Sequence, residues 1–391
     1  MGPTHVRYGA VAVFVRRQDW PGPRVVRMMT VARQLGLKVL FVGARRDCTE
    51  VTASEPGGFA IERIGRPFRR FHGRGAIGYL FSVVGYSVSL SCYLWRVRPA
   101  LVHASDFEVY GAARLYAAIT GAAVMYNIHD NLALRYRCAA IARWCLNVLE
   151  GLAARWATVA LVPEVHRRDA LPKWSRSRVV IARNTPIDPG FSPPSGGGPA
   201  VTLLYAGWID TGRGIRQLAR LAGRHPQLTL RVAGAGDREL VAEMSDEGGV
   251  TLLGRISHDD ALQETRDCDF VCALYDPDVP VNRHAASNKV AEALAVGRPV
   301  VINREVGVVS LLEPYGCLVV VDYHGVERAG ARLVGLRATA GDYAEMCRGA
   351  RQAYEDHYSW DGVEAATIEA YRRAGVRVTG DEADGPRTAK D

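Results

Sequence analysis

Short apolar runs recur along the whole chain, and polar helix-forming segments separate them. The runs are continuous rather than alternating, which is typical of strands buried on both faces of a parallel sheet. The helical patterns between them end on glycine, as at Gly36 and Gly121. The predicted strands are "GAVAVFV", "LKVLFVG", "ALVHAS", "AAVMYNI", "ATVALVP" and "RVVIARN" in the first half, and "VTLLYAG", "LTLRVAG", "VTLLGR", "DFVCAL", "RPVVIN" and "GCLVVVD" in the second.

This alternation predicts the α/β class, with two Rossmann-like domains whose parallel sheets face each other across a cleft. The chain has 391 residues, more than one ordinary domain needs. The stretch "FSPPSGGGP", residues 191–199, has the composition of a linker. We therefore expect one domain over residues 1–190 and another over residues 200–355. The polar tail from residue 376 to 391 is expected to be disordered.

Composition excludes several classes of protein. The eight cysteines form no Cys-x-x-Cys pair and no zinc-binding spacing, so they indicate a reducing compartment and no metal site. The N-terminal stretch lacks the features of a secretory signal, which predicts a cytoplasmic protein. The net charge of +8 accompanies no recognisable nucleic-acid-binding module, so a nucleic-acid partner is not expected.

Charge is distributed unevenly along the chain. Residues 1–190 hold 27 Lys and Arg against 12 Asp and Glu, a balance of +15, whereas residues 191–391 hold 22 against 29, a balance of −7. A basic half can meet an anionic membrane face or an acidic acceptor. A solvated, arginine-rich surface is the alternative interpretation.

The segment Ala76 to Trp95 carries no charge over 20 residues, so its length alone permits a membrane span. It contains two glycines and four serines, and a helix end follows it. These features favour a helix that is buried or lies on a membrane surface, with the protein peripheral at the inner membrane face.

Ligands of open parallel sheets bind beyond the carboxyl ends of the strands, so the residues there were examined first. In "LLYAGWIDTGRGI", loop amides and Arg213 would favour an anion next to Gly214, although a plain turn is the alternative. In "VAGAGD", Gly234 and Gly236 allow close approach of a ligand, or serve a turn. The loop at Arg255 suits a nucleotide base, or merely caps a helix.

The stretch "SNKVAEALAVGRPVVI" places Lys289 and Glu292 on one helix face. On a surface helix such a pair is worth under about 1 kcal/mol. Asn288 and Lys289 stand at the helix N-terminus, however, where a cation is disfavoured unless an anion is bound. Glu292 can accept hydrogen bonds from a vicinal diol such as a ribose. The stretch therefore predicts a nucleoside-diphosphate site.

The motifs "YAGWIDTGRGI", "VAGAGD", "LLGRIS" and "NKVAEALAVGRPVV", in this order, resemble the C-terminal half of GT-B glycosyltransferases, especially glycosyltransferase family 4. The likeness covers about residues 200–325. It implies that Glu292 holds the donor ribose, that Arg213 and Lys289 neutralise the diphosphate, and that the reaction retains configuration. It also implies no metal and no tightly bound cofactor. Residues 356–375 resemble the closing helix that returns to the N-terminal domain.

Two positions depart from the family pattern. His284 stands where relatives often have a second Glu, and Gly207-Trp208 replaces a common Gly-Arg. Both departures concern the choice of donor sugar. In the other half, "VMYNIHDN" matches the His-Asp that relatives place after a strand, so the resemblance implies that His129 and Asp130 face the donor sugar or acceptor.

The first strand–helix loop supplies Gly22 and Arg24, which could approach a diphosphate or acceptor; alternatively, Pro-Gly-Pro only shapes a turn. The expected function is sugar transfer from a nucleoside-diphosphate sugar to a small-molecule, lipid-linked or glycan acceptor. A sugar-nucleotide epimerase and a catalytically inactive nucleotide-sugar-binding protein are the alternatives.

Overall fold

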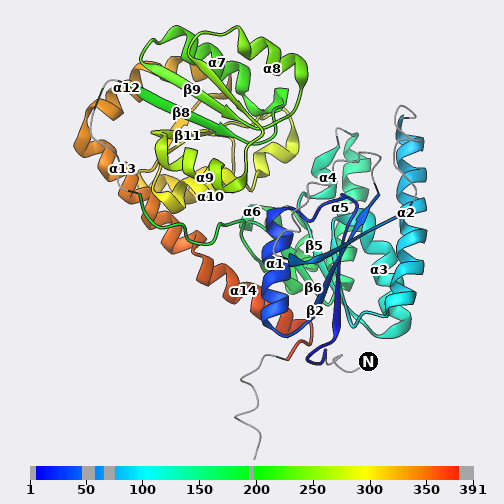
Figure 1. Ribbon diagram of the computed structural model, residues 1–391. Coiled ribbons are helices and arrows are strands. Elements are labelled where there is room, and N and C mark those ends of the chain that lie inside the picture. Colours follow the sequence, from blue (N-terminus) through cyan, green and yellow to red (C-terminus); the bar gives the residue numbers. More distant parts are fainter. Residues whose placement is uncertain are drawn as a thin grey trace, which may run out of the picture. The chain divides into compact units, whose positions relative to one another are not determined.

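The computed structural model describes residues 6–45, 58–65, 75–136, 138–192, 198 and 200–377. The chain divides into two compact units, each with its own sheet (Figure 1). The first unit comprises Met1–Ala182 with Glu364–Asp391, and the second comprises Arg183–Val363. Most of the predicted linker, residues 193–197 and 199, and the tail from 378 lie outside the described residues.

The first unit contains a seven-stranded parallel sheet in the order β3-β2-β1-β4-β5-β6-β7. Each of the six strands predicted in this half is present, and the innermost ones are buried along their whole length, as the continuous apolar runs indicated. The strands are β1 (Val11–Arg16), β2 (Lys38–Ala44), β3 (Ala60–Ile64), β4 (Leu101–Ser105), β5 (Ala123–Asn127), β6 (Val159–Val162) and β7 (Val179–Ile181).

Helices follow the strands of the first unit. Helix α3 ends at Gly121, whose φ of 75° is a left-handed conformation that glycine adopts without strain. The helices are α1 (Gly22–Gln34), α2 (Gly75–Val97), α3 (Phe107–Thr120), α4 (Leu132–Arg135), α5 (Ala140–Trp156) and α6 (Val165–Asp169).

Helix α2 contains the uncharged segment Ala76 to Trp95. Its residues Tyr86, Leu90 and Leu94 are buried and join the core of the first unit. By length and composition, the stretch Gly78–Val97 could cross a membrane, yet 28% of its most apolar window is buried inside the protein. The helix is therefore partly a core helix, as expected, with a second face that remains outside the core.

The second unit contains a six-stranded parallel sheet in the order β10-β9-β8-β11-β12-β13. All six strands predicted in this half are present. Leu203 and Leu204, which are adjacent on β8, pack into different hydrophobic clusters because side chains of a strand point alternately to its two faces. The strands are β8 (Val201–Ala206), β9 (Leu228–Ala233), β10 (Val250–Gly254), β11 (Phe270–Ala273), β12 (Val300–Asn303) and β13 (Leu318–Val321).

The helices of the second unit cover both faces of this sheet, and Figure 1 shows α7 and α8 on one face and α9 and α10 on the other. They are α7 (Ile215–Arg224), α8 (Arg238–Ser245), α9 (His258–Asp267), α10 (Asn288–Val296), α11 (Val309–Leu312), α12 (Gly330–Ala338) and α13 (Ala340–Ala353). Helix α14 (Trp360–Arg373) follows a π-helical turn at Tyr354–Tyr358.

The second unit begins at Arg183, before the predicted linker. The Asn184 side chain donates to the carbonyl of Ala286 at 2.9 Å, and Asp188 pairs with Arg351 at 2.7 Å. These bonds attach residues 183–190 to the second unit. The predicted closing helix, residues 356–375, corresponds to α14, and its far end belongs to the first unit, where the Tyr371 hydroxyl donates to the carbonyl of Met28 at 3.1 Å.

Arg298, from the "GRPVV" signature, has a structural role. Its side chain is 3% exposed and donates to the carbonyls of Arg266, Cys268 and Ser192. These bonds satisfy carbonyl groups beside the start of β12. The cysteines within the described residues are all free thiols.

In both sheets the strand order reverses at one point, between β1 and β4 and between β8 and β11. The carboxyl ends of the strands at such a switch point form a natural ligand site. The two-sheet α/β fold predicted from the sequence is confirmed, and the switch points identify where to examine its chemistry.

Candidate functional site

At the switch point of the second unit, two cations lie against two tyrosine rings. Lys289 Nζ is 3.7 Å from the ring centroid of Tyr205 and 5.9 Å from that of Tyr275. The guanidinium carbon of Arg213 is 5.0 Å from the same Tyr275 centroid. The structure therefore brings together the two cations that the sequence predicted as diphosphate ligands.

The environment of Lys289 disfavours its positive charge. Burial, reinforced by the neighbouring charge of Arg213, lowers the pKa of Lys289 to about 7. The aromatic faces of Tyr205 and Tyr275 compensate part of the lost hydration. An anion bound beside Lys289 and Arg213 would relieve the repulsion between the two cations.

The N-terminus of α10 presents unsatisfied polar atoms beside Lys289. Ser287 precedes the helix without capping it through its side chain. Within the part of the chain that the structure describes, the buried Ser287 Oγ and Asn288 Oδ1 have no hydrogen-bond partner. A buried unsatisfied polar group costs about 1–3 kcal/mol. These atoms, together with the positive end of the helix dipole, indicate a polar ligand at this helix end.

Glu292 lies one turn further along α10. Its side chain is 14% exposed, and Oε1 is 3.9 Å from Nδ1 of His258, the first residue of α9. Ser257 caps α9 by accepting a hydrogen bond from the backbone N–H of Asp260 at 3.1 Å, and Arg255 is exposed in the same loop. The loop predicted to meet a nucleotide base thus adjoins the predicted ribose-binding carboxylate.

Two predicted glycines stand at the loop that follows β8. A Cβ atom at Gly207 would lie 3.5 Å from Lys289 Nζ, so this position adjoins the predicted diphosphate site. Gly214 precedes α7 with a φ of 65°, and a Cβ atom there would come within 2.6 Å of Leu274. Its absence of a side chain serves packing as well as backbone conformation.

The glycines after β9 are required by a neighbouring backbone. A Cβ atom at Gly234 would lie 1.8 Å from the carbonyl oxygen of Gly207, and one at Gly236 would lie 1.9 Å from that of Ile209. The Ile209 N–H donates to the carbonyl of Ala235 at 3.0 Å, which extends the pairing of the two strands into their loops. The close approach predicted for a ligand is made here by the protein itself, and a ligand contact remains a prediction.

The two departures from the family pattern lie near this site in the sequence but differ in exposure. His284 ends a half-buried 3-10 turn that precedes α10. The Trp208 side chain is 66% exposed, while its carbonyl accepts a hydrogen bond from the Tyr205 hydroxyl at 2.5 Å. The chain therefore presents an exposed indole where relatives have a phosphate-binding guanidinium.

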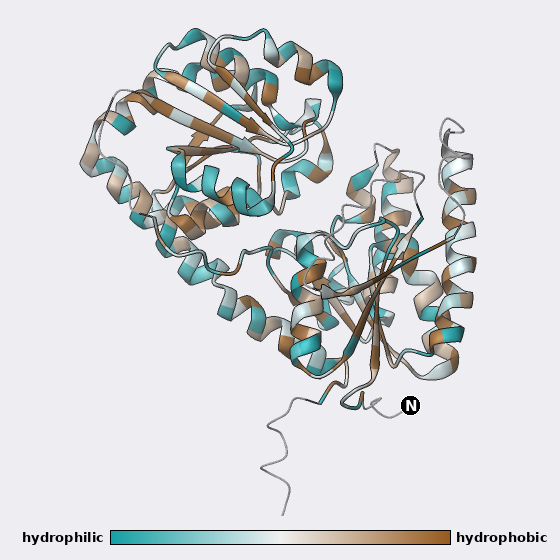
Figure 2. Ribbon diagram, in the orientation of Figure 1, coloured by the Kyte–Doolittle hydropathy of each residue, from teal (hydrophilic) through white to brown (hydrophobic). Residues whose placement is uncertain are grey.

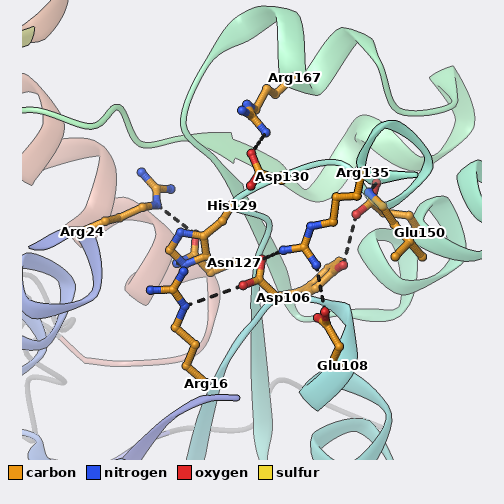
Figure 3. A network of polar contacts seen from close by, with 12 residues as sticks. Arg16, Arg24, Asp106, Glu108, Asn127, His129, Asp130, Arg135, Glu150 and Arg167 are labelled. Carbon is orange, nitrogen blue, oxygen red and sulfur yellow. Dashed lines mark hydrogen bonds and ion pairs between the residues drawn. The ribbon is translucent and has the colours of Figure 1, made fainter. Parts of the chain in front are cut away.

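In the first unit, Asn127 at the end of β5 connects two predicted residues (Figure 3). Its Oδ1 accepts a hydrogen bond from Arg24 Nε at 3.1 Å, and its Nδ2 lies 3.2 Å from His129 Nε2. Arg24 and His129 come from different loops of the sequence, and the fold places them at one amide.

His129 is held neutral. Burial is the main cause that lowers its pKa well below the usual value, and the charges of Arg16, Arg24 and Arg135 add to it. A neutral imidazole has one donor and one acceptor nitrogen, which suits a hydroxyl group of a sugar or acceptor.

A network of charges that sequence reasoning missed lies next to His129. Arg135 Nη2 is 2.8 Å from Asp106 Oδ1, Arg135 Nη1 is 2.9 Å from Glu108 Oε1, and Arg16 Nε is 3.7 Å from Asp106 Oδ2. Figure 3 shows Arg16 and Arg135 pointing toward Asp106 from opposite sides.

The only signal of this network in the sequence is its place at strand ends. Arg16 ends β1, and Asp106 follows β4, in the same position as His129 after β5. Asp106 also adopts a φ of 73° and ψ of 162°, a conformation that strains a residue with a side chain by about 1–3 kcal/mol. Such strain is typical of functional sites.

The remaining predicted residues of the first unit lie at the edge of this network. Asp130 is half exposed and pairs with the buried Arg167 at 2.7 Å. Gly22 has a φ of 73°, and a Cβ atom there would lie 3.0 Å from Arg16 Nη1. In the described residues, no group of three or more His, Cys, Asp or Glu side chains could hold a metal ion.

Comparison with known proteins agrees with this geometry. Residues 203–335 match the family model described as "Glycosyl transferases group 1". No curated protein sequence matches the chain. Similar solved structures include sucrose-phosphate synthase from Thermosynechococcus elongatus, with a TM-score of 0.73 and 14% identity over 93% of this chain and 98% of that one.

Two further structures have the same fold. HepE of Anabaena, in complex with UDP and glucose, has a TM-score of 0.70 and 14% identity over 93% of this chain and 99% of that one. A glycosyltransferase from Rickettsia africae ESF-5 has a TM-score of 0.66 and 12% identity over 94% and 98% of the two chains. The chain therefore has the GT-B fold, and its second unit carries a group 1 glycosyl transferase domain.

Proposed function

We propose that the chain transfers a sugar from a nucleoside-diphosphate sugar to a hydroxyl group of an acceptor, with retention of anomeric configuration. The observation that carries this proposal is the convergence of Lys289 and Arg213 on the ring of Tyr275, one helical turn from Glu292. The similarity to HepE, solved with UDP and glucose, supports a donor of this class.

In this proposal the two cations stabilise the leaving group. Cleavage of the anomeric bond leaves negative charge on the β-phosphate, next to Lys289, Arg213 and the N-terminus of α10. Groups already aimed at a developing charge lower the barrier, and one such donor is worth roughly 3 kcal/mol. Asn288 Oδ1 and Ser287 Oγ, buried beside the helix end, would bind donor hydroxyl or amide groups.

Glu292 would orient the nucleoside. Its carboxylate is mostly buried and can accept two hydrogen bonds from the 2′- and 3′-hydroxyls of a ribose. A charged acceptor in such a site strengthens each bond. The base would then lie toward the loop at Arg255, Ser257 and His258, which begins beside Glu292.

The first unit would bind the acceptor or the donor sugar through His129. A neutral imidazole near Arg16 and Arg24 can hydrogen-bond a hydroxyl without taking its proton. The departing phosphate itself would deprotonate the acceptor on the face it leaves, which gives retention without a dedicated base. We propose a small-molecule, lipid-linked or glycan acceptor, a cytoplasmic reaction, and no requirement for a metal.

The test is substitution of Glu292 by Ala. Loss of two hydrogen bonds to a charged group is expected to weaken UDP-glucose binding by about 1.5–3 kcal/mol, or roughly 10- to 100-fold in Kd. Calorimetric titration measures the affinity. The matched control is Glu345→Ala, because the Glu345 side chain is 76% exposed on α13.

The expected result is lost affinity in Glu292→Ala with an unchanged melting curve, and wild-type affinity in Glu345→Ala. Wild-type affinity and turnover in Glu292→Ala would overturn the assignment of the ribose site.

A nucleotide-sugar-binding protein without turnover is the second candidate, because exposed Trp208 replaces the arginine of relatives. Binding without turnover across a broad acceptor panel would favour it. A sugar-nucleotide epimerase is distinguished by incubation with a sugar nucleotide alone, since epimerisation needs no acceptor and transfer does.

A further inference from the structure

Helix α2 has two apolar faces, and the core of the first unit covers one of them. Tyr86, Leu90, Tyr93 and Leu94 are at most 5% exposed and pack in the hydrophobic core. Ser89 and Ser91 donate to carbonyls four residues earlier, so their hydroxyls are satisfied within the helix. This side of α2 resembles any core helix.

The other face leaves large apolar side chains in solvent. Leu80 is 61%, Phe81 63%, Val84 52% and Val88 60% exposed. At about 100° per residue, these four positions fall within one stripe along the helix. Figure 2 shows α2 coloured white and brown over most of its length, with little of the teal that marks the outer faces of other helices.

Basic residues flank this stripe. No charged residue occurs from Gly75 to Trp95, whereas Arg96 and Arg98 follow at once. In the sequence before the helix, residues 63–74 contain five arginines and no acidic residue. An apolar face between two basic borders is complementary to a membrane surface, where acyl chains lie beneath anionic headgroups.

We propose that the exposed face of α2 docks the first unit on an anionic lipid surface, with the helix lying in the plane of the interface. Leu80, Phe81, Val84 and Val88 enter the acyl boundary, and the flanking arginines meet the headgroups. The proposal goes beyond sugar transfer; for that reaction, on which this step rests, it favours a lipid-linked acceptor.

Two other occupants of this face fit the observations less well. A membrane span would require Leu90 and Leu94 to leave the core, because a spanning helix must be surrounded by lipid. A second copy of the chain would bring together two halves that each carry a sequence charge of +15. Like charges at an interface oppose association, whereas an anionic surface attracts them.

The experiment is vesicle co-sedimentation of the full chain without nucleotide. The vesicles are phosphatidylcholine with phosphatidylglycerol, or phosphatidylcholine alone. The variants are Leu80→Ser/Phe81→Ser/Val84→Ser and Phe81→Ser alone. The matched control for the single variant is Ile187→Ser, because Ile187 is 64% exposed in the second unit.

The wild type and Ile187→Ser are expected to bind the anionic vesicles and to be released by high salt. The triple variant is expected to lose at least roughly tenfold in partition coefficient. Equal partition of the triple variant and wild type would overturn the proposal. Resistance of the wild type to alkaline extraction would overturn it in favour of a span, and a dimer abolished by the triple variant would overturn it in favour of a second copy.

Binding of UDP-glucose in solution, measured on the same triple variant, separates this inference from the proposed function. Vesicle binding that is absent while donor binding persists would overturn the docking surface alone. Absent donor binding in the wild type would overturn the proposed function.

Discussion

Lys289 is the residue on which the donor site depends most. It occupies a buried position over the Tyr205 ring and next to the charge of Arg213, and its pKa falls to about 7. Near neutral pH the free protein therefore holds a mixture of charged and neutral Lys289. A bound diphosphate would favour the charged form and raise the pKa.

This gives a pH prediction. The affinity for UDP-glucose is expected to be greatest below pH 7 and to fall as pH rises above 7, by up to about tenfold per unit, because binding must then take up a proton. Calorimetry in buffers of different ionisation enthalpy measures that uptake. The diphosphate of UDP-glucose does not itself titrate in this range, which makes it a suitable probe.

The control is Lys289→Met, which is expected to bind more weakly and to lose this pH dependence. An affinity of the wild type that does not change between pH 6 and 9 would contradict the role of Lys289 as a diphosphate ligand.

At the residue scale, the sequence predicted the parts of the site that local patterns encode. Lys289 and Glu292 share a helix face by their spacing, and Arg213 follows a strand within one loop. Arg16 and Arg135 could not be predicted, because their partner Asp106 lies far away in the sequence and meets them only through the sheet. The strained backbone of Asp106 likewise has no local signal.

At the scale of elements, the loops after β8 and β9 form one structure. Their backbones pair beyond the ends of the strands, through Ile209 with Ala235 and Asp237, and two glycines make the contact possible. Gly207 and Trp208 belong to this paired structure, so its geometry determines what the site presents to a ligand.

Gly236→Ala is therefore expected to destabilise the second unit. The added methyl group would lie 1.9 Å from the Ile209 carbonyl oxygen, and the loops must separate to admit it. The expected loss is about 1–3 kcal/mol of unfolding free energy, with weaker UDP-glucose binding. Thermal denaturation measures the stability, at about 2–4 °C per kcal/mol for a unit of this size.

Gly248→Ala is the matched control, since a Cβ atom there would meet nothing within 4 Å. It is expected to match the wild type in both measurements. A Gly236→Ala protein with wild-type melting temperature and affinity would show that the loop contact has no such role.

The elements themselves were largely predictable. Twelve strands follow from continuous apolar runs, because strands buried on both faces need them. Strand β3 was missed: it lies at the sheet edge, and its residues "AIERI" are only partly buried, so its pattern is weak. Helix α2 was predicted as a helix, but its exposed face could not be, because its composition is apolar all round.

At the scale of the whole molecule, two sheets with the same kind of switch point divide the work. The second unit gathers cations beside a helix N-terminus, and the first gathers a neutral histidine within a network of charges. No local pattern predicts which loops meet at a switch point, so the fold had to supply that part of the account.

Because Arg213 and Lys289 supply positive charge at the leaving group, turnover is expected to need no divalent metal. Excess EDTA is expected to leave the rate of sugar transfer unchanged. A loss of activity that Mg²⁺ or Mn²⁺ restores would contradict this expectation.

The most direct test of the central claim is a crystal structure of the chain with UDP-glucose. The account predicts β-phosphate oxygens within hydrogen-bonding distance of Lys289 Nζ and the Arg213 guanidinium, and ribose hydroxyls on the Glu292 carboxylate. A nucleotide bound elsewhere, or bound with these three side chains turned away from it, would contradict the account.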